Sequence, residues 1–182
     1  MQKYGRSLLV LATMLIALCG CGPDTSNTYA EQTVILNKPT PASFVISSPL
    51  EGALLRDGKP LSHARIIRRL RWNDNEEGIT REYHTDESGF FSLPAHEETL
   101  SIGPLEQFVG KTNIDVEQDG ILETFWFSAK TQGDLNSEYD ILPEELICDI
   151  SNADLGVNIN FGTCMTKCRW SNMPKPFDPN EP

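Results

Sequence analysis

The sequence predicts an all-β protein built as a single antiparallel β-sandwich. Short runs of β-branched and aromatic residues recur between turn signals, and no segment shows a long apolar repeat of 3.6 residues. Residues 43–170 number roughly 130, which is enough for one hydrophobic core and too few for two domains. Many short strands separated by frequent turns favour a sandwich.

Turn residues set the limits of the expected strands. Asp57-Gly58 is a strong hairpin signal, and Gln118-Asp119-Gly120 needs a positive φ that glycine readily supplies. A third turn, from Asp86 to Gly89, precedes a short apolar strand. Between such signals we expect strands at 44–47, 53–56, 64–72, 79–85, 90–93, 111–117, 121–130, 146–150 and 157–161.

Alternation gives the strand at 64–72 an apolar face and a basic face. Arg68 falls on the apolar face, so we expect it to extend to the sheet edge or to pair with a carboxylate. In a later strand, Phe125 and Phe127 alternate with Trp126 and are expected on the opposite face. The apolar face of 64–72 otherwise holds Ala64, Ile66, Leu70 and Trp72, and the basic face holds Arg65, Ile67, Arg69 and Arg71.

The first 21 residues have the form of an export signal. Two basic residues precede an apolar run from Leu8 to Leu18, which is too short to span roughly 30 Å of hydrocarbon as a helix. Leu18 and Gly20 precede Cys21, and this pattern resembles the bacterial lipobox. The resemblance implies cleavage after residue 20 and acylation of Cys21. An ordinary secretory signal cleaved nearby is the alternative.

An acylated Cys21 would hold the protein at a membrane while the polypeptide stays in water. Gly22, not Asp, follows the cysteine, and resemblance to Gram-negative sorting rules implies the outer membrane, facing the periplasm. Residues 21–42 are mostly polar and contain three prolines, so we expect a flexible linker. The expected layout is therefore a signal peptide at 1–20, the lipidated linker at 21–42, the sandwich at 43–170 and a disordered Pro-rich tail at 171–182.

The formal net charge of −11 disfavours nucleic acid as a partner, because an acidic protein is repelled by phosphate backbones. Three cysteines remain after the signal and Cys21 are set aside. In an oxidising compartment, Cys148 would pair with Cys164 or with Cys168, and the loop closed would contribute about 3 kcal/mol. The spacing alone leaves both pairings open. A zinc site is disfavoured because Cys164 and Cys168 have no second close pair of ligands.

Two segments resemble a known fold family. Gly58 to Ile66, followed by Thr85 to Phe91, is similar to the hairpin and turn of the carboxypeptidase-regulatory-like, or prealbumin-like, β-sandwich. The resemblance implies that Asp86 caps the turn, that Gly89 takes the left-handed conformation, and that Phe91 or its neighbour fills the core.

The rest of the chain resembles one uncharacterised proteobacterial family of small exported proteins built on that sandwich. The shared pattern consists of Trp72, Phe125-Trp126, Cys148-Asp149 and a closing cysteine, Cys164 or Cys168, near Trp170. This resemblance implies a fold and carries no biochemical role.

Other fragments do not reach the pattern of a catalytic or metal site. Gly110-Lys111-Thr112 lacks the earlier glycine of a phosphate-binding loop, since Leu105 stands there. The segment beginning at Asp115 has Trp126 where a calcium loop needs a bidentate Glu. The three histidines share no metal spacing, and no nucleophile elbow is present. We therefore expect no metal, no cofactor and no enzymatic activity.

A basic stripe stands out in this acidic chain. It comprises Lys59, His63, Arg65, Arg69 and Arg71. One interpretation is a solvated strand face whose charges are balanced across the hairpin by Glu76, Glu77, Glu82 or Asp86. The other is a patch that recognises an anion or a protein.

The sequence favours a lipid-anchored, non-catalytic module that binds a protein or another envelope component. The expected partners are the membrane, through the anchor, and one unidentified envelope partner. The alternatives are a periplasmic immunity protein that inhibits a secreted toxic enzyme, an envelope hydrolase and a structural role in the envelope.

Overall fold

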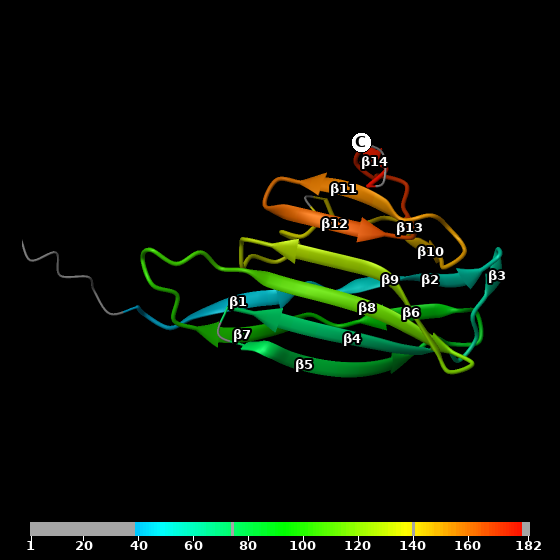
Figure 1. The fold of residues 1–182 in the computed structure, drawn as a ribbon, viewed down its shortest axis with the longest axis horizontal. Coiled ribbons are helices and arrows are strands. Elements are labelled where there is room, and N and C mark those ends of the chain that lie inside the picture. Colours follow the sequence, from blue (N-terminus) through cyan, green and yellow to red (C-terminus); the bar gives the residue numbers. More distant parts are fainter. Residues whose placement is uncertain (1–38, 74, 140, 180–182) are drawn as a thin grey trace, which may run out of the picture. The chain divides into compact units, whose positions relative to one another are not determined.

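The computed structural model describes residues 39–73, 75–139 and 141–179 (Figure 1). The expected signal peptide, Cys21 and most of the linker lie outside these ranges. No helix in the described part of the chain is long and apolar enough to cross a membrane.

The described residues form strands, turns and loops. In chain order the strands are β1 (Ala42–Ser47), β2 (Leu50–Arg56), β3 (Lys59–Pro60), β4 (Arg65–Trp72), β5 (Asn75–His84), β6 (Phe90–Leu93), β7 (His96–Leu100), β8 (Gly110–Gln118), β9 (Ile121–Lys130), β10 (Ile147–Asp149), β11 (Leu155–Ile159), β12 (Gly162–Thr166), β13 (Cys168–Arg169) and β14 (Pro176–Phe177).

These strands form two main sheets that pack as a sandwich. The larger sheet has seven strands in the order β14-β11-β12-β9-β8-β4-β5. The smaller has five, in the order β13-β10-β2-β3, with β6 also paired to β2. Strands β1 and β7 form a separate antiparallel pair. The pairing of β10 with β2 is parallel, and the other described pairs are antiparallel. The all-β sandwich expected from the sequence is confirmed.

The predicted hairpin turns are confirmed. Asp57 and Gly58 have φ values of 51° and 72° between β2 and β3, and Asp119 and Gly120 have 54° and 78° between β8 and β9. Positive φ at both central residues matches the right-handed twist of the flanking strands.

The turn before β6 also forms as the resemblance implies. The Asp86 Oδ1 atom accepts hydrogen bonds from the backbone N–H of Ser88 at 2.8 Å and of Phe90 at 2.9 Å. The Ser88 hydroxyl and these N–H groups hold the pKa of Asp86 below its ordinary value. Gly89 has a φ of 80°, and Phe91 is buried in the core.

The main core lies between the two sheets. The seven-stranded sheet contributes Ile66, Ile114 and Trp126, and the five-stranded sheet contributes residues such as Leu54 and Phe91. A smaller cluster forms beneath the β1–β7 pair, from Ile46, Leu70, Trp72, Leu100 and Phe108.

A β-bulge corrects the expected alternation of β9. Ile114 pairs with Trp126, whereas the next residue of β8, Asp115, pairs with Thr124, so Phe125 is left as the extra residue. A bulge lets consecutive side chains turn toward the same face. As a result Phe125 and Trp126 are both buried in the core, so the expected alternation is wrong for Phe125. Phe127 lies on the face opposite Trp126, as expected.

Arg68 also differs from expectation, because it neither reaches the sheet edge nor pairs with a carboxylate. Its side chain is buried, donates to the Pro94 carbonyl at 2.7 Å and lies 5.9 Å from the centroid of the Tyr83 ring. Burial lowers the pKa of this guanidinium. The aromatic ring and the carbonyl take the place of an ion pair.

The expected disorder of the tail is wrong for part of 171–179. Pro176 and Phe177 form β14, which pairs with Val157 and Gly156 of β11. The Phe177 ring lies directly on Gly156, because a Cβ atom at that glycine would come within 2.2 Å of the ring. A glycine in β11 therefore creates the space in which the tail docks.

Candidate functional site

The structure divides the predicted basic stripe between two sheets. Arg65, Arg69 and Arg71 alternate along β4 and project from the outer face of the seven-stranded sheet. Lys59 is exposed on β3 of the other sheet, and His63 is exposed in the loop before β4. The stripe is therefore shorter than predicted, and only its β4 part belongs to this face.

Arg65 is fully compensated by carboxylates on both neighbouring strands. Its guanidinium contacts Glu82 of β5 at 2.5 Å and also pairs with Glu117 of β8. The hydrogen bond from Arg65 holds the pKa of Glu82 below its ordinary value. At this end of the stripe the positive charge is balanced across the hairpin, which agrees with the interpretation of a solvated strand face. Such exposed pairs contribute little to stability.

Arg69 is compensated by a buried carboxylate beneath it. Its guanidinium pairs with Asp115, whose side chain is 1% exposed. Asp115 also accepts hydrogen bonds from Asn113 Nδ2 at 2.7 Å and Thr124 Oγ1 at 2.5 Å. The Arg69 Nε atom is buried and has no hydrogen-bond partner. Arg69 thus carries a neutralised charge and one unused donor.

Arg71 and Lys111 remain uncompensated. They stand directly opposite each other on β4 and β8, so their Cβ atoms are neighbours on one face of the sheet. In the described part of the chain neither side chain makes an ion pair or hydrogen bond. Two like charges at facing positions repel each other and disfavour the folded state.

These two cations overlook a shallow depression of about 200 Å³ on the outer face. We call it the basic depression, and its lining includes Arg69, Arg71, Lys111, Asn113, Thr124 and Phe127. A neighbouring hollow of about 230 Å³ shares Arg71 and Lys111 and adds Trp72, Asn73 and Glu76. Glu76 makes no ion pair with either cation.

Gly78 leaves room for the Arg71 side chain. The pairing of β4 with β5 is irregular between Leu70 and Trp72, and Gly78 has a φ of 76° at this point. A Cβ atom on Gly78 would come within 2.2 Å of the Leu70 carbonyl oxygen and 2.7 Å of Arg71 Cγ. Asn75 Oδ1 accepts from the Gly78 N–H at 2.8 Å and secures the irregularity.

The structure contains one of the two disulfide pairings that the sequence allowed. Cys148 of β10 and Cys168 of β13 face each other and are joined, whereas Cys164 is free and buried. Burial raises the pKa of the Cys164 thiol far above its ordinary value. A buried, protonated thiol is a poor nucleophile, so Cys164 is a core residue.

Asp149, which follows the bridged Cys148, accepts hydrogen bonds from the β2–β3 turn and from its own loop. Its two oxygens accept the backbone N–H of Asp57 at 3.1 Å, of Gly58 at 2.7 Å and of Ser151 at 3.0 Å. Partial burial opposes ionisation, yet these hydrogen bonds together hold the pKa of Asp149 below its ordinary value. The Cys-Asp pair therefore ties β10 to the β2–β3 hairpin and is structural.

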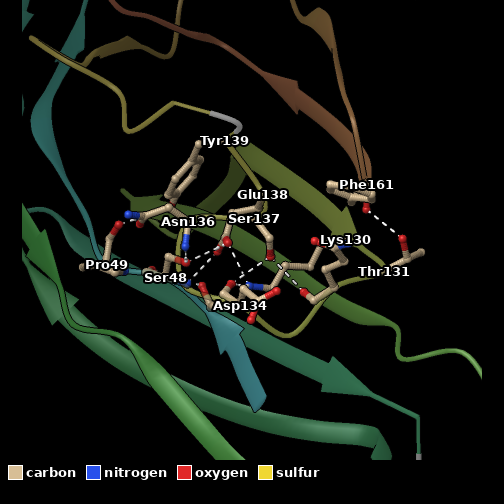
Figure 2. A network of polar contacts seen from close by, with 12 residues as sticks. Ser48, Pro49, Lys130, Thr131, Asp134, Asn136, Ser137, Glu138, Tyr139 and Phe161 are labelled. Carbon is tan, nitrogen blue, oxygen red and sulfur yellow. Dashed lines mark hydrogen bonds and ion pairs between the residues drawn. The ribbon is translucent and has the colours of Figure 1, made fainter. Parts of the chain in front are cut away.

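A buried polar network lies on the inner side of the seven-stranded sheet (Figure 2). Lys130 Nζ contacts Glu138 Oε2 at 2.8 Å, and the Ser48 hydroxyl donates to the same oxygen at 2.7 Å. The Ser48 N–H donates to Glu138 Oε1 at 2.5 Å, and Ser48 Oγ accepts from the Asn136 N–H at 2.7 Å.

This network joins the corner between β1 and β2 to β9 and the loop that follows it. Ser48, Lys130 and Glu138 are each at most 2% exposed, so a substrate does not reach them in this structure. Burial lowers the pKa of Lys130, while Glu138 opposes that shift. The network places a serine near a lysine, but because both side chains are buried we interpret it as an interaction that stabilises the fold.

The outer face of the five-stranded sheet has a different character. Phe90, Ala53 and Ile147 lie in one row across β6, β2 and β10. Phe90 and Ile147 are exposed, and Glu51 and Glu145 border the shallow hollow that they line. The same row ends at Arg169 of β13, opposite Ile147. This face is therefore mainly apolar and acidic, with one cation at its end, and differs from the basic depression on the other sheet.

Sequence reasoning found Arg69 and Arg71 and missed their partners on β8. Glu117 stands opposite Arg65 and Lys111 opposite Arg71 because β4 pairs with β8, which is far away in the sequence. The same pairing places Asp115 opposite Ile67, within reach of the Arg69 guanidinium. Alternation in 111–117 places these three residues on one face, and that signal was present. Among the described residues, no group of three or more His, Cys, Asp or Glu side chains is placed to hold a metal ion.

A family model described as a domain of unknown function, DUF6795, matches residues 50–153, more than half of the chain. The protein belongs to the DUF6795 family. The matched region of this DUF6795 protein runs from β2 to beyond β10, and it contains Arg71, Lys111, Glu138 and Asp149. Cys168, which completes the disulfide, lies outside it. No curated protein and no solved structure matches the chain.

Proposed function

We propose that this DUF6795 protein is a non-catalytic binding module of the cell envelope, anchored through an acylated Cys21. The observation that supports binding most directly is the uncompensated pair Arg71 and Lys111 beside the basic depression. Facing like charges lower stability, and an anion bound between these two side chains would remove their repulsion.

The fold suits this role. The outer face of the seven-stranded sheet presents its side chains on a rigid, hydrogen-bonded surface, and cationic and polar side chains border the open depression. The sequence at Cys21 supplies the proposed anchor, which would keep this surface at the membrane.

The binding surface is tested by crosslinking in intact cells that produce the full chain. We compare the natural protein with the double variant Arg71→Gln/Lys111→Gln. Lys59→Gln/Arg81→Gln is the matched control, because it removes one lysine and one arginine charge from exposed positions outside the basic depression. We expect one envelope component to crosslink to the natural protein and to the control, and to be lost in the double variant. Identical crosslinks in all three proteins would refute the surface.

The anchor is tested separately by mass spectrometry of the N-terminus of the protein recovered from membranes. We expect a diacylated or triacylated Cys21 as the first residue, and release of the Cys21→Ser variant from the membrane fraction. A bare N-terminus would refute the anchor and leave the binding surface intact.

A further inference from the structure

We propose that the basic depression binds a dianionic phosphoryl group, held between Arg71 and Lys111. This inference rests on the proposed binding function and names the chemical class of its ligand. It follows from the charge count, the donors and the apolar wall of the depression.

The charge count favours a dianion. Asp115 neutralises Arg69, so Arg71 and Lys111 bring two positive charges to the depression. Glu76 lines only the neighbouring hollow and makes no ion pair with either cation. A phosphomonoester carries a charge of about −1.5 to −2 near pH 7 and has three acceptor oxygens. A carboxylate carries a single charge and would leave one of the two facing cations unpaired.

The donors also match a phosphoryl group. A guanidinium presents a planar fork that binds two phosphate oxygens, and an ammonium adds a compact charge. Arg71 and Lys111 supply these two groups from facing positions on β4 and β8. The Arg69 guanidinium belongs to the same lining and is paired with Asp115, so Arg71 and Lys111 are the groups left to bind a ligand.

The remainder of the lining favours a phosphoryl group attached to a larger molecule. Phe127 contributes an aromatic wall to the depression, and Asn113 and Thr124 lie beside it. A polynucleotide does not fit this site, because the chain as a whole carries a net charge of −11 and would repel a long polyanion. The ligand class is therefore a single phosphoryl group on a soluble molecule or on a lipid headgroup.

The test is calorimetric titration of the purified full-length protein in nonionic detergent micelles, at pH 7.5 and low ionic strength. The probe is inorganic phosphate, with acetate at the same ionic strength as the monoanionic comparison. We expect phosphate to bind about tenfold or more tightly than acetate. The double variant Arg71→Gln/Lys111→Gln should weaken phosphate binding by about tenfold or more, and Lys59→Gln/Arg81→Gln should leave it within about twofold.

A second titration distinguishes the two sources of the phosphoryl group. Micelles doped with phosphatidic acid present a phosphomonoester headgroup, and micelles doped with phosphatidylglycerol present a phosphodiester. Displacement of phosphate by phosphatidic acid alone supports a lipid headgroup. Displacement by neither lipid, with phosphate still bound, supports a soluble phosphorylated ligand.

Equal affinity for phosphate and acetate would overturn the proposal, and so would equal loss of binding in the control variant. If phosphate binding fails while the crosslinks of the envelope partner still depend on Arg71 and Lys111, the binding function stands and the phosphoryl assignment is wrong. If both fail, the binding surface itself is wrong.

Discussion

At the scale of single residues, Gly78 shows how one position shapes the basic depression. Only a residue without a side chain fits between the Leu70 carbonyl and Arg71, and its φ of 76° favours glycine for a second reason.

We therefore predict that Gly78→Ala lowers the free energy of unfolding by about 2–4 kcal/mol, from backbone strain and steric overlap together. Gly58→Ala is the control. Gly58 has a φ of 72° but has open space around the position of a Cβ, so only strain of about 1 kcal/mol is expected. Urea unfolding measures both variants. Equal losses would mean that the contact with Leu70 and Arg71 is unimportant.

The success of prediction from the sequence depends on how local each interaction is. The roles of Asp86 and Gly89 follow from a few neighbouring residues, and the structure confirms them. The burial of Phe125 depends on a bulge opposite Asp115, and alternation alone does not reveal it. The expectation for Arg68 was wrong for the same reason, because the carbonyl that accepts its hydrogen bond, at Pro94, lies on a distant segment.

At the scale of elements, the buried network joins the corner between β1 and β2 to β9 and the loop after β9. Removing one partner from a buried ion pair leaves an uncompensated charge, which typically lowers stability by about 3–5 kcal/mol.

We predict a loss of this size for Glu138→Gln, measured by urea unfolding. The double variant Lys130→Met/Glu138→Gln should lose much less than the sum of its single changes, because it removes both charges. Glu82→Gln, which breaks an exposed pair with Arg65, should change stability by less than about 1 kcal/mol. If the losses of unfolding free energy from the changes at Lys130 and Glu138 were additive, the two side chains would not be energetically coupled.

The disulfide secures β13 against β10 through a loop with a sequence separation of 20. We predict that Cys148→Ala/Cys168→Ala loses about 3 kcal/mol of unfolding free energy in the chain-entropy model. Cys164→Ala should lose less, because it leaves the crosslink intact. Alkylation of the unfolded, unreduced protein followed by peptide mapping should modify Cys164 and leave Cys148 joined to Cys168. A peptide linking Cys148 to Cys164 would contradict the structure.

The strands themselves were largely predictable, whereas their pairing was not. Turn residues and alternation located most of the strands, because both signals are local. The pairing of β4 with β8 joins segments about 45 residues apart, and no local pattern specifies it. The docking of β14 on β11 was missed because prolines suggested disorder, while Gly156 provided the matching space.

At the scale of the whole molecule, the two outer faces of the sandwich differ in chemistry. One carries the basic depression, and the other carries an apolar row bordered by Glu51 and Glu145. Two surplus cations on a chain with a net charge of −11 form a local positive field, and under the proposed function this contrast would steer an anionic group to one face.

The central claim is that Arg71 and Lys111 serve binding and do not stabilise the fold. The most direct measurement is the unfolding free energy of the natural protein and of Arg71→Gln/Lys111→Gln, each with phosphate and with chloride at equal ionic strength. In chloride, we predict that the double variant is at least as stable as the natural protein, because the repulsion between facing cations is gone.

Phosphate should then stabilise the natural protein and leave the double variant unchanged, since a ligand stabilises only the state that binds it. A double variant that is less stable in chloride, together with equal stabilisation of both proteins by phosphate, would contradict this account.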